Sequence, residues 1–335
     1  MNEVYIVSTG AFLPGPARSN DEIELVLGEI SPQLERYRAV VLRRNGIEQR
    51  HYAMTEAGDP THSNVQLAEQ AAVSCLKGSG RQFSEVDFLT FGTTVGDVMI
   101  PAFAQCVHGI LGAQGMKPLA VHPTSGVCLS GIHGVQAAYW AIASGDAKLA
   151  LCGGSERPSA VLKHHRYTEE YAKHQQLEAA YEGYSYFHAD FLRYMLSDGA
   201  GSWLLSNKPA DNGLSLKIDW IKTRSFAAEL PTCMYMGTVR PDSVAPDDSW
   251  LAYPSAQQAE QDGALNIRQD VGLLSKHIAR HGALFMRDLV DSGVLDEHAI
   301  NWIFPHLSSF FFKDKTVEAL KDVDIHFLMP NTGPT

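Results

Sequence analysis

Several features are absent from this sequence of 335 residues. It has no run of about 18 or more apolar residues, so no transmembrane helix is expected. Its N-terminus has no basic segment ahead of an apolar stretch, which argues against a signal peptide. Its five cysteines are odd in number and widely spaced, with no Cys-x-x-Cys pair, so neither a disulfide framework nor a zinc site is expected. Together these absences predict a cytoplasmic protein with reduced thiols.

Positive charge is also scarce. The chain has 27 Lys and Arg against 38 Asp and Glu, a formal net charge of −11. Nucleic-acid binders draw much of their affinity from neutralising phosphates, so that class is disfavoured. Hydrophobic residues make up 45% of the chain, which is typical of a globular protein with a large core. The length predicts about two domains.

Strand-like and helix-like segments alternate along the first part of the chain. The patterns predict strands at residues 4–9, 86–93, 119–122 and 149–152, and a glycine turn into a strand within 197–206. They predict helices at residues 63–76 and 102–111, and a third from Leu129 to the stop at Gly145. This alternation predicts an α/β fold with a mostly buried sheet.

The rhythm changes after Glu156. Residues 160–195 are rich in polar and aromatic side chains and have a pattern typical of helices, and we expect an insertion there. A linker follows near residues 207–213. Beyond it the patterns predict strands at 214–220, 301–304 and 325–329, and helices at 267–289 and 313–320. We therefore expect two α/β halves, residues 1–207 and 208–335, related by duplication.

Cys128 stands in an unusual context. In T-S-G-V-C-L-S-G-I-H-G-V, residues 124–135, glycines and hydroxyls surround it and a helical pattern follows. The first N–H groups of a helix have no internal partner and carry partial positive charge, so a thiolate there is stabilised and its pKa is expected to fall. The same groups can hold an oxyanion. The alternative is an inert core cysteine, our interpretation of the other four. His133 is expected to pack on another helix face.

Two polar side chains follow predicted strands of the second half. His306 occurs in W-I-F-P-H-L-S-S and Asn331 in F-L-M-P-N-T-G, each at the carboxyl end of a strand, where the sites of α/β proteins gather. A lone histidine there is more often structural. With Cys128, however, the three suit thioester chemistry, because an imidazole and a carboxamide can donate N–H bonds to a thioester carbonyl and to its enolate.

These residues resemble the ketoacyl synthase III branch of the thiolase superfamily. The resemblance also includes R-N-G-I-E-Q-R-H at 44–51, G-T-T at 92–94, G-G-S-E at 153–156, D-G-A-G at 198–201, P-H at 305–306 and P-N-T-G at 330–333. It implies a thiolase-like five-layered αβαβα duplication with two mixed sheets, usually a homodimer. It implies carbon–carbon bond formation through an acylated Cys128, assisted by His306 and Asn331. No bound cofactor is implied, since substrates arrive as thioesters on the phosphopantetheine of an acyl carrier protein or on coenzyme A.

Three longer stretches are similar to the dialkylresorcinol-forming ketosynthases of bacterial secondary metabolism. They are F-L-R-Y-M-L-S-D-G-A-G, P-H-L-S-S-F-F-F-K-D-K and N-I-R-Q-D-V-G-L-L. Such enzymes join a β-ketoacyl thioester to a second acyl thioester and close a six-membered ring. In them Glu156 is a candidate acid or base, because a partly buried carboxylate can have a raised pKa. The alternative is a carboxylate at the start of a helix.

The sequence also departs from the fatty-acid-initiating members of this branch. Val40 and Phe311 stand where those members carry a tryptophan and an arginine that grip coenzyme A, which weighs against coenzyme A priming. The family continues through further strands, so the second half is expected to be cut short at Thr335. The basic stretch K-H-H-R at 163–166 is expected as a solvated face or as a docking site for an acidic carrier protein.

Other functions stay open at this point. One is a ketoacyl synthase III that initiates fatty-acid or polyketide chains, and another is a ketosynthase-like acyltransferase to oxygen or nitrogen. A papain-like hydrolase uses the same three residue types, but the C-G-S-C-W signature is missing. A non-enzyme alternative is an inactive partner subunit of a heterodimeric ketosynthase. The presence of Cys128, His306 and Asn331 favours the condensing enzyme.

Overall fold

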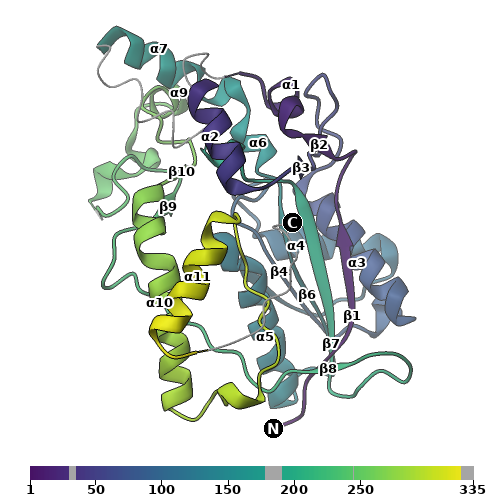
Figure 1. Cartoon of the computed structure of the whole chain (residues 1–335). Helices are drawn as coiled ribbons and strands as arrows, with labels where there is room; N and C mark the ends of the chain where they lie inside the picture. Colours follow the sequence, from purple (N-terminus) through teal and green to yellow (C-terminus); the bar gives the residue numbers. More distant parts are fainter. Residues whose placement is uncertain (30–34, 178–190, 244, 326–335) are drawn as a thin grey trace. The chain divides into compact units, whose positions relative to one another are not determined.

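The computed structural model describes residues 1–29, 35–177, 191–243 and 245–325 (Figure 1). The chain divides into two compact units. The first comprises Met1–Arg18, His51–Ala160 and Ser197–Thr223, and the second comprises Ser19–Arg50, Val161–Leu196 and Arg224–Thr335. The expected halves 1–207 and 208–335, and their origin by duplication, stay predictions.

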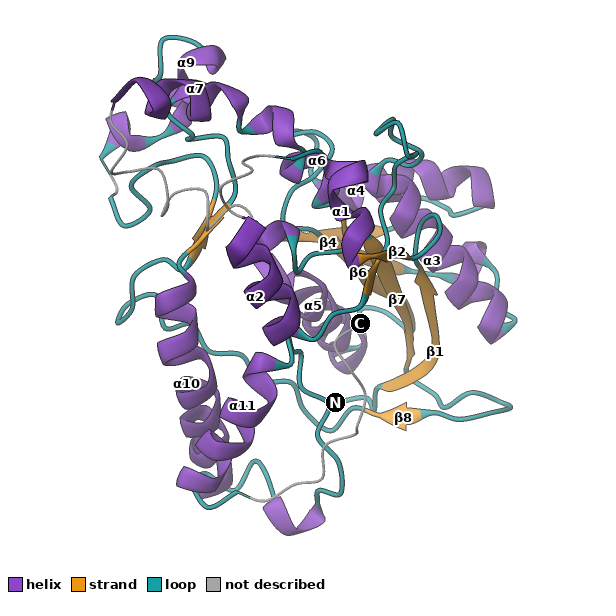
Figure 2. Ribbon diagram, turned by 45° about the horizontal axis from the view of Figure 1, so that its top comes forward, coloured by secondary structure: helices purple, strands orange, loops and turns teal. Residues whose placement is uncertain are grey.

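The first unit is built on a six-stranded mixed sheet with the order β5-β4-β6-β7-β1-β8 (Figure 2). Its strands are β1 (Tyr5–Phe12), β4 (Phe88–Gly92), β5 (Ala120–Thr124), β6 (Leu149–Glu156), β7 (Gly199–Ser206) and β8 (Leu216–Lys217). β4 runs parallel to β5 and to β6, whereas β7 is antiparallel to β6 and to β1. The three parallel strands therefore end at one edge of the sheet, at Thr124, Gly92 and Glu156.

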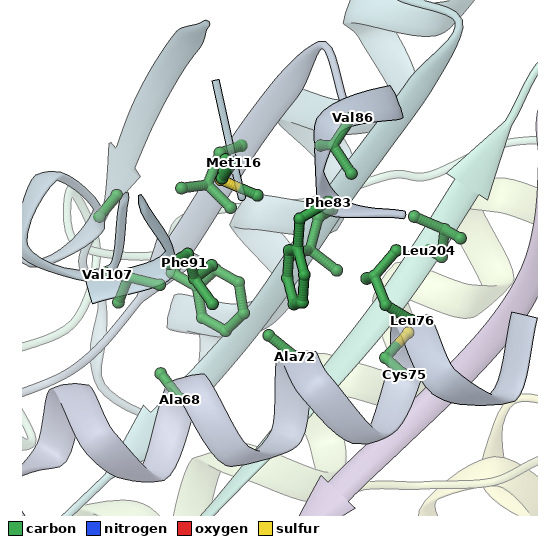
Figure 3. Packing of buried hydrophobic residues seen from close by; sticks show 14 of the residues in the cluster. Ala68, Ala72, Cys75, Leu76, Phe83, Val86, Phe91, Val107, Met116 and Leu204 are labelled. Atoms are coloured by element: carbon green, nitrogen blue, oxygen red, sulfur yellow. The ribbon is translucent and has the colours of Figure 1, made fainter. Parts of the chain in front are cut away.

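Helices cover both faces of this sheet. α3 (Asn64–Ser79) and α4 (Phe103–Leu111) pack on one face, where Figure 3 shows Ala68 and Ala72 of α3 beside the rings of Phe83 and Phe91. α5 (Ser130–Ser144) packs on the other face, through Val135, Ala138, Ile142 and Ala143. These three helices confirm the sequence-based prediction.

α3 begins where its sequence predicts. The Ser63 side chain accepts the backbone N–H of Gln66, while the Gln66 side chain accepts the backbone N–H of Ser63, a reciprocal capping box. At the other end Gly80 adopts φ +69°, a left-handed cap that glycine takes without steric cost.

Two strands, β6 and β8, differ most in length from their predictions. β6 continues past Cys152 to Glu156, because β7 pairs along its whole length and Glu156 lies opposite Gly199. Of the strand expected at 214–220, only the two residues of β8 form a strand, and they pair with Tyr5 and Ile6 at the edge of this sheet. In both cases the neighbouring strand, which periodicity does not identify, decides where pairing stops.

Small residues let α5 approach the sheet very closely. A Cβ atom on Gly92 would lie 2.4 Å from the Ser130 carbonyl oxygen, so β4 meets the first turn of α5 backbone to backbone. A Cβ atom on Gly154 of β6 would lie 3.1 Å from the Cα atom of Gly131. The start of α5 is thereby fixed against the ends of β4 and β6.

The second unit is mainly helical in the part that the structure describes. It contains α1 (Ile23–Leu27), α2 (Glu35–Asn45), α7 (Thr168–Leu177), α9 (Ala256–Gln261), α10 (Val271–Asp291) and α11 (Phe311–Asp322). The short strands β9 (Met234–Tyr235) and β10 (Arg268–Gln269) pair with each other. Three further short elements are β2 (Arg18–Ser19), β3 (Gln49–Arg50) and α6 (Ser159–Leu162). α10 and α11, both expected from the sequence, share a small core of Ala283, Leu320 and Ile325.

Of the two mixed sheets expected, the described residues form one. At residues 301–304 the backbone pairs only through a single bridge residue, Trp302, and the strand expected at 325–329 lies outside the described residues apart from Ile325. A strand exists only when a neighbour pairs with its backbone groups, so an apolar run alone does not secure one. Within residues 1–29, 35–177, 191–243 and 245–325, no helix combines the length and the apolar character needed to cross a bilayer.

The close approach of α5 predicts a strong effect of a small substitution. In Gly92→Ala the new methyl group meets the Ser130 carbonyl, and we expect a loss of about 3 kcal/mol or more in unfolding free energy because the packed backbone must shift. The matched control is Gly201→Ala on β7, where a Cβ atom would find open space. Denaturant titration of both variants measures the difference, and equal stabilities would contradict the packing described.

Candidate active site

Cys128 lies in a tight turn between β5 and α5. The short 3-10 helix Val127–Leu129 follows β5 and leads directly into α5, which starts at Ser130. The Leu129 N–H donates to the Gly126 carbonyl at 2.9 Å and closes the turn. Cys128 is exposed in this position. The structure thus confirms the expected strand, turn and helix, with the cysteine where the helix begins.

The residue before the cysteine has an unusual backbone. Val127 adopts φ +47°, in the left-handed region. For a β-branched side chain this region is sterically unfavourable, and such strain persists only where the surroundings hold it. Strained residues of this kind cluster at functional sites. The strain therefore singles out this turn within the first unit.

The pKa of Cys128 differs from the sequence-based expectation. Although the residue as a whole is exposed, the protein atoms around its sulfur partly desolvate the thiol and raise its pKa. The negative charge of Glu156 raises that pKa further, against a hydrogen bond from the cysteine's own backbone N–H. We expected the helix start to lower the pKa, and that expectation was wrong. The leading amides carry only partial charges, whereas desolvation and a full carboxylate charge both disfavour the thiolate. At neutral pH the thiol stays mainly protonated and needs a base.

Glu156 supplies a candidate for that base. It is the last residue of β6, and its Oε1 accepts the backbone N–H and the hydroxyl of Thr94, each at 2.7 Å. Burial raises the pKa of Glu156 to about 7, and the hydrogen bonds from Thr94 and Thr93 limit the rise. Glu156 is not a carboxylate at the start of a helix. It ends β6 and accepts hydrogen bonds from Thr94 in the loop after β4, and α6 begins only at Ser159.

A buried polar network holds that loop in place. The Asn64 amide donates to the Thr93 hydroxyl at 2.8 Å, and the Ser155 hydroxyl donates to the Asn64 amide oxygen at 2.6 Å. Asp97 in turn accepts the backbone N–H groups of Asn64 and Val65, each at 3.0 Å. Because every member has a partner, the network fixes the groups that bind Glu156.

Of the two partners predicted in the second half, the structure describes His306 but not Asn331. His306 lies in the loop before α11, in the second unit, and burial lowers the pKa of its imidazole, which is therefore mainly neutral at pH 7. Asn331 lies outside the described residues. Cys128 and Glu156 both lie in the first unit, close enough for the Glu156 charge to raise the pKa of the thiol. The convergence of His306 and Asn331 on Cys128 stays a prediction.

Reasoning from the sequence missed three contributors to this site. Thr94 binds the Glu156 carboxylate, and its signal was a polar pair directly after a buried strand, in G-T-T. Ser130 donates its hydroxyl to the Val127 carbonyl at 2.7 Å. The strained φ of Val127 had no signal, since valine ordinarily indicates extended backbone.

The other cysteines fit the structural interpretation. All five cysteines are free. Cys75 and Cys152 are buried on either side of the sheet, and burial raises the pKa of both, that of Cys75 to about 11. Both residues are 0% exposed, so no substrate reaches either sulfur, whereas Cys106 and Cys233 are half-buried.

Comparisons with known proteins give relatives of similar sequence and solved structures of similar fold. No protein-family model matches the chain. The β-ketoacyl-[acyl-carrier-protein] synthase III of Bordetella petrii is 34% identical over 164 residues, 48% of this chain and 46% of the relative. The enzyme of the same name from Anaplasma marginale is 30% identical over 162 residues, again 48% and 46%. The chain spans about half the length of these curated relatives.

Solved structures match over nearly the whole chain. AbyA1, a tetronic acid condensing enzyme, has a TM-score of 0.67 at 17% identity, with 97% of this chain and 84% of that chain covered. The 3-oxoacyl-(acyl carrier protein) synthase III of Pseudomonas aeruginosa has a TM-score of 0.57 at 19% identity, covering 99% and 85%. At these identities the likeness shows the fold alone. Sequence similarity over about half of the chain and fold similarity over nearly all of it make this protein similar to enzymes named β-ketoacyl-[acyl-carrier-protein] synthase III.

Proposed function

We propose that this protein is a ketosynthase III-like condensing enzyme, which forms a carbon–carbon bond between two acyl thioesters through an acyl-Cys128 intermediate. The observation that carries the proposal is the exposed Cys128 in a strained turn at the start of α5, beside a carboxyl group whose pKa is about 7. The curated relatives, named as β-ketoacyl synthases III, support thioesters as the substrates.

The first step is acyl transfer to the cysteine. Glu156, close to half ionised near pH 7, accepts the thiol proton as the Cys128 sulfur attacks the thioester carbonyl carbon. The leading N–H groups of α5 stabilise the tetrahedral oxyanion. The bond from carbon to the carrier's sulfur then breaks, and the departing thiolate takes the proton from Glu156. The products are acyl-Cys128 and a free carrier thiol.

The second step joins two carbons. The acceptor thioester loses a proton from its α-carbon, and Glu156 accepts that proton. The enolate carbon attacks the acyl group on Cys128, the new carbon–carbon bond forms, and the Cys128 thiolate leaves and recovers the proton. His306, neutral at pH 7, and Asn331 would donate N–H bonds to the acceptor carbonyl as it becomes an enolate. This chemistry calls for no bound cofactor.

The substrates and carrier form a finer proposal. Similarity of three stretches to the dialkylresorcinol-forming ketosynthases favours a β-ketoacyl thioester as acceptor and a dialkylresorcinol or cyclohexanedione type of product in secondary metabolism. Val40 and Phe311, which replace coenzyme A contacts, favour an acyl carrier protein as donor. Residues 164–166 of the basic stretch are exposed, which suits docking of an acidic carrier. Chain initiation, the activity in the relatives' names, is the second candidate.

Assembly and location are also proposals. β5 is an edge strand, and Ala120, His122 and Pro123 on it are exposed. Elsewhere in the first unit Val98, Met99 and Ile100 are 52%, 79% and 86% exposed. Unpaired strand edges and exposed apolar residues mark surfaces that a second copy can cover, which supports a homodimer. The five free cysteines support a reducing cytoplasm.

Acylation of Cys128 is directly measurable. Intact-mass spectrometry after incubation with a panel of acyl carrier protein and coenzyme A thioesters should show one acyl adduct on the native protein. Cys128→Ala should show none, since no other thiol combines exposure with a place beside Glu156. Cys106→Ala, a change at a half-buried cysteine, should keep the adduct. An adduct on Cys128→Ala, or none on the native protein with any donor, would contradict the mechanism.

Glu156→Gln should change how stability depends on pH. The folded-state pKa of Glu156, about 7, lies above its ordinary value of 4.5, so the carboxyl favours the folded state below about pH 4.5. That contribution is lost as pH rises through about 7. From pH 4.5 to about pH 8 the variant should therefore gain on the order of 2–3 kcal/mol over the native protein. Denaturant titrations across this window test the sign; a constant difference rejects it.

The same substitution separates two roles at the cysteine. Without the negative charge the pKa of Cys128 falls, so the midpoint of its alkylation by iodoacetamide should move to lower pH. Acyl transfer to Cys128 should nevertheless slow by about 100-fold, because the general base is gone. A variant that alkylates faster and acylates equally fast would show that Glu156 acts on the thiol's pKa without serving as its base.

A further inference from the structure

We propose that Ser130 and His133 are positioning residues for Cys128, which hold the Gly126–Val127 turn in the conformation that presents the sulfur. The inference rests on the proposed role of Cys128 and adds two residues that neither touch the substrate nor carry the reacting atoms. The strained backbone of Val127 persists only while neighbouring groups prevent it from relaxing.

Ser130 ties the strained residue to the helix. It is 2% exposed and is the first residue of α5. The Val127 carbonyl accepts both the backbone N–H of Ser130 and its hydroxyl, the latter at 2.7 Å. The Ser130 carbonyl in turn accepts the hydroxyl of Thr124, the last residue of β5, at 2.8 Å. Ser130 therefore connects both ends of the turn.

His133, three residues after Ser130 in α5, packs against the Gly126–Val127 turn. A Cβ atom on Gly126 would lie 3.3 Å from Nδ1 and 3.4 Å from Cε1 of His133, so the imidazole packs directly against this glycine. Gly126 itself adopts φ +150°, which residues with a side chain rarely reach. The sequence predicted packing for His133, and the structure identifies what it packs on.

The two contacts bear on reactivity because of where they act. The dihedral angles of Val127 set the direction in which the chain enters Cys128, and hence the position of its sulfur relative to Glu156 and the leading amides of α5. If Val127 relaxes to an ordinary φ, the sulfur moves away from both. A misplacement of about 1 Å at a reacting atom can cost roughly 100-fold in rate.

The test is Ser130→Ala, which removes the hydroxyl and keeps the helix. The matched control is Ser144→Ala at the last residue of α5, where the hydroxyl makes the same kind of bond, to the Ala141 carbonyl at 3.0 Å. Ser130→Thr restores a hydroxyl. The rate constants for acylation and for iodoacetamide alkylation of Cys128 are measured across pH, beside thermal stability. We expect about a tenfold loss of both rates in Ser130→Ala, less than twofold in Ser144→Ala, and partial recovery in Ser130→Thr.

His133→Ala provides a second route, with His108→Ala on α4 as its control, and it decides the question if Ser130→Ala does not fold. It should slow both reactions severalfold. Native-like rates in both Ser130→Ala and His133→Ala would overturn the inference, as would equal losses in Ser130→Ala and Ser144→Ala that follow stability alone. Should the native protein accept no donor, the proposed function fails, while the alkylation rates still test the positioning.

Discussion

The backbone contact between α5 and the ends of β4 and β6 is the constraint on which the site depends. Gly92 and Gly154 leave no side chain between sheet and helix, so Ser130 and Gly131 meet strand backbone directly. The Cys128 turn, which immediately precedes Ser130, thereby lies at the edge where the parallel strands end. Glu156 and the Thr93–Thr94 loop lie at the same edge. The helix packing, the strained turn and the neighbouring carboxyl group thus lie together where helix and strands approach closely.

This placement changes how the cysteine would react. A helix start alone would favour a thiolate, but the protein atoms around the Cys128 sulfur partly desolvate it, and Glu156 adds a full negative charge. Both groups therefore favour their neutral forms, the thiol protonated and the carboxyl with a pKa of about 7. In the proposed mechanism such a pair would keep the thiol protonated until a substrate binds, and one proton would then move from the sulfur to the carboxylate. The arrangement favours a mechanism in which Glu156 accepts the Cys128 proton during the reaction over one that begins from a thiolate.

Local signals in the sequence predicted local structure well. The Ser63 and Gln66 box, the apolar faces of α10 and α11, and the glycine stop of α5 at Gly145 all depend on neighbours within a few residues. They also predicted Cys128 at a helix start, whereas the acid or base role of Glu156, which the family resemblance implies, stays a prediction. The extent of β6 and the reduction of β8 depend on partners far along the chain. The direction of the Cys128 pKa and the φ of Val127 arise only from packing in three dimensions, which no local pattern contains.

The pKa of Glu156 tests the central claim most directly, because it depends on burial at the closely packed edge that also holds Cys128. Carbon-detected NMR of the side-chain carboxyl groups, with the Glu156 signal assigned by its loss in Glu156→Gln, gives that value without reference to any substrate. The structure predicts a titration midpoint near 7. A midpoint near the ordinary value of 4.5 would mean that water reaches this carboxyl group freely, and would contradict the arrangement of the site.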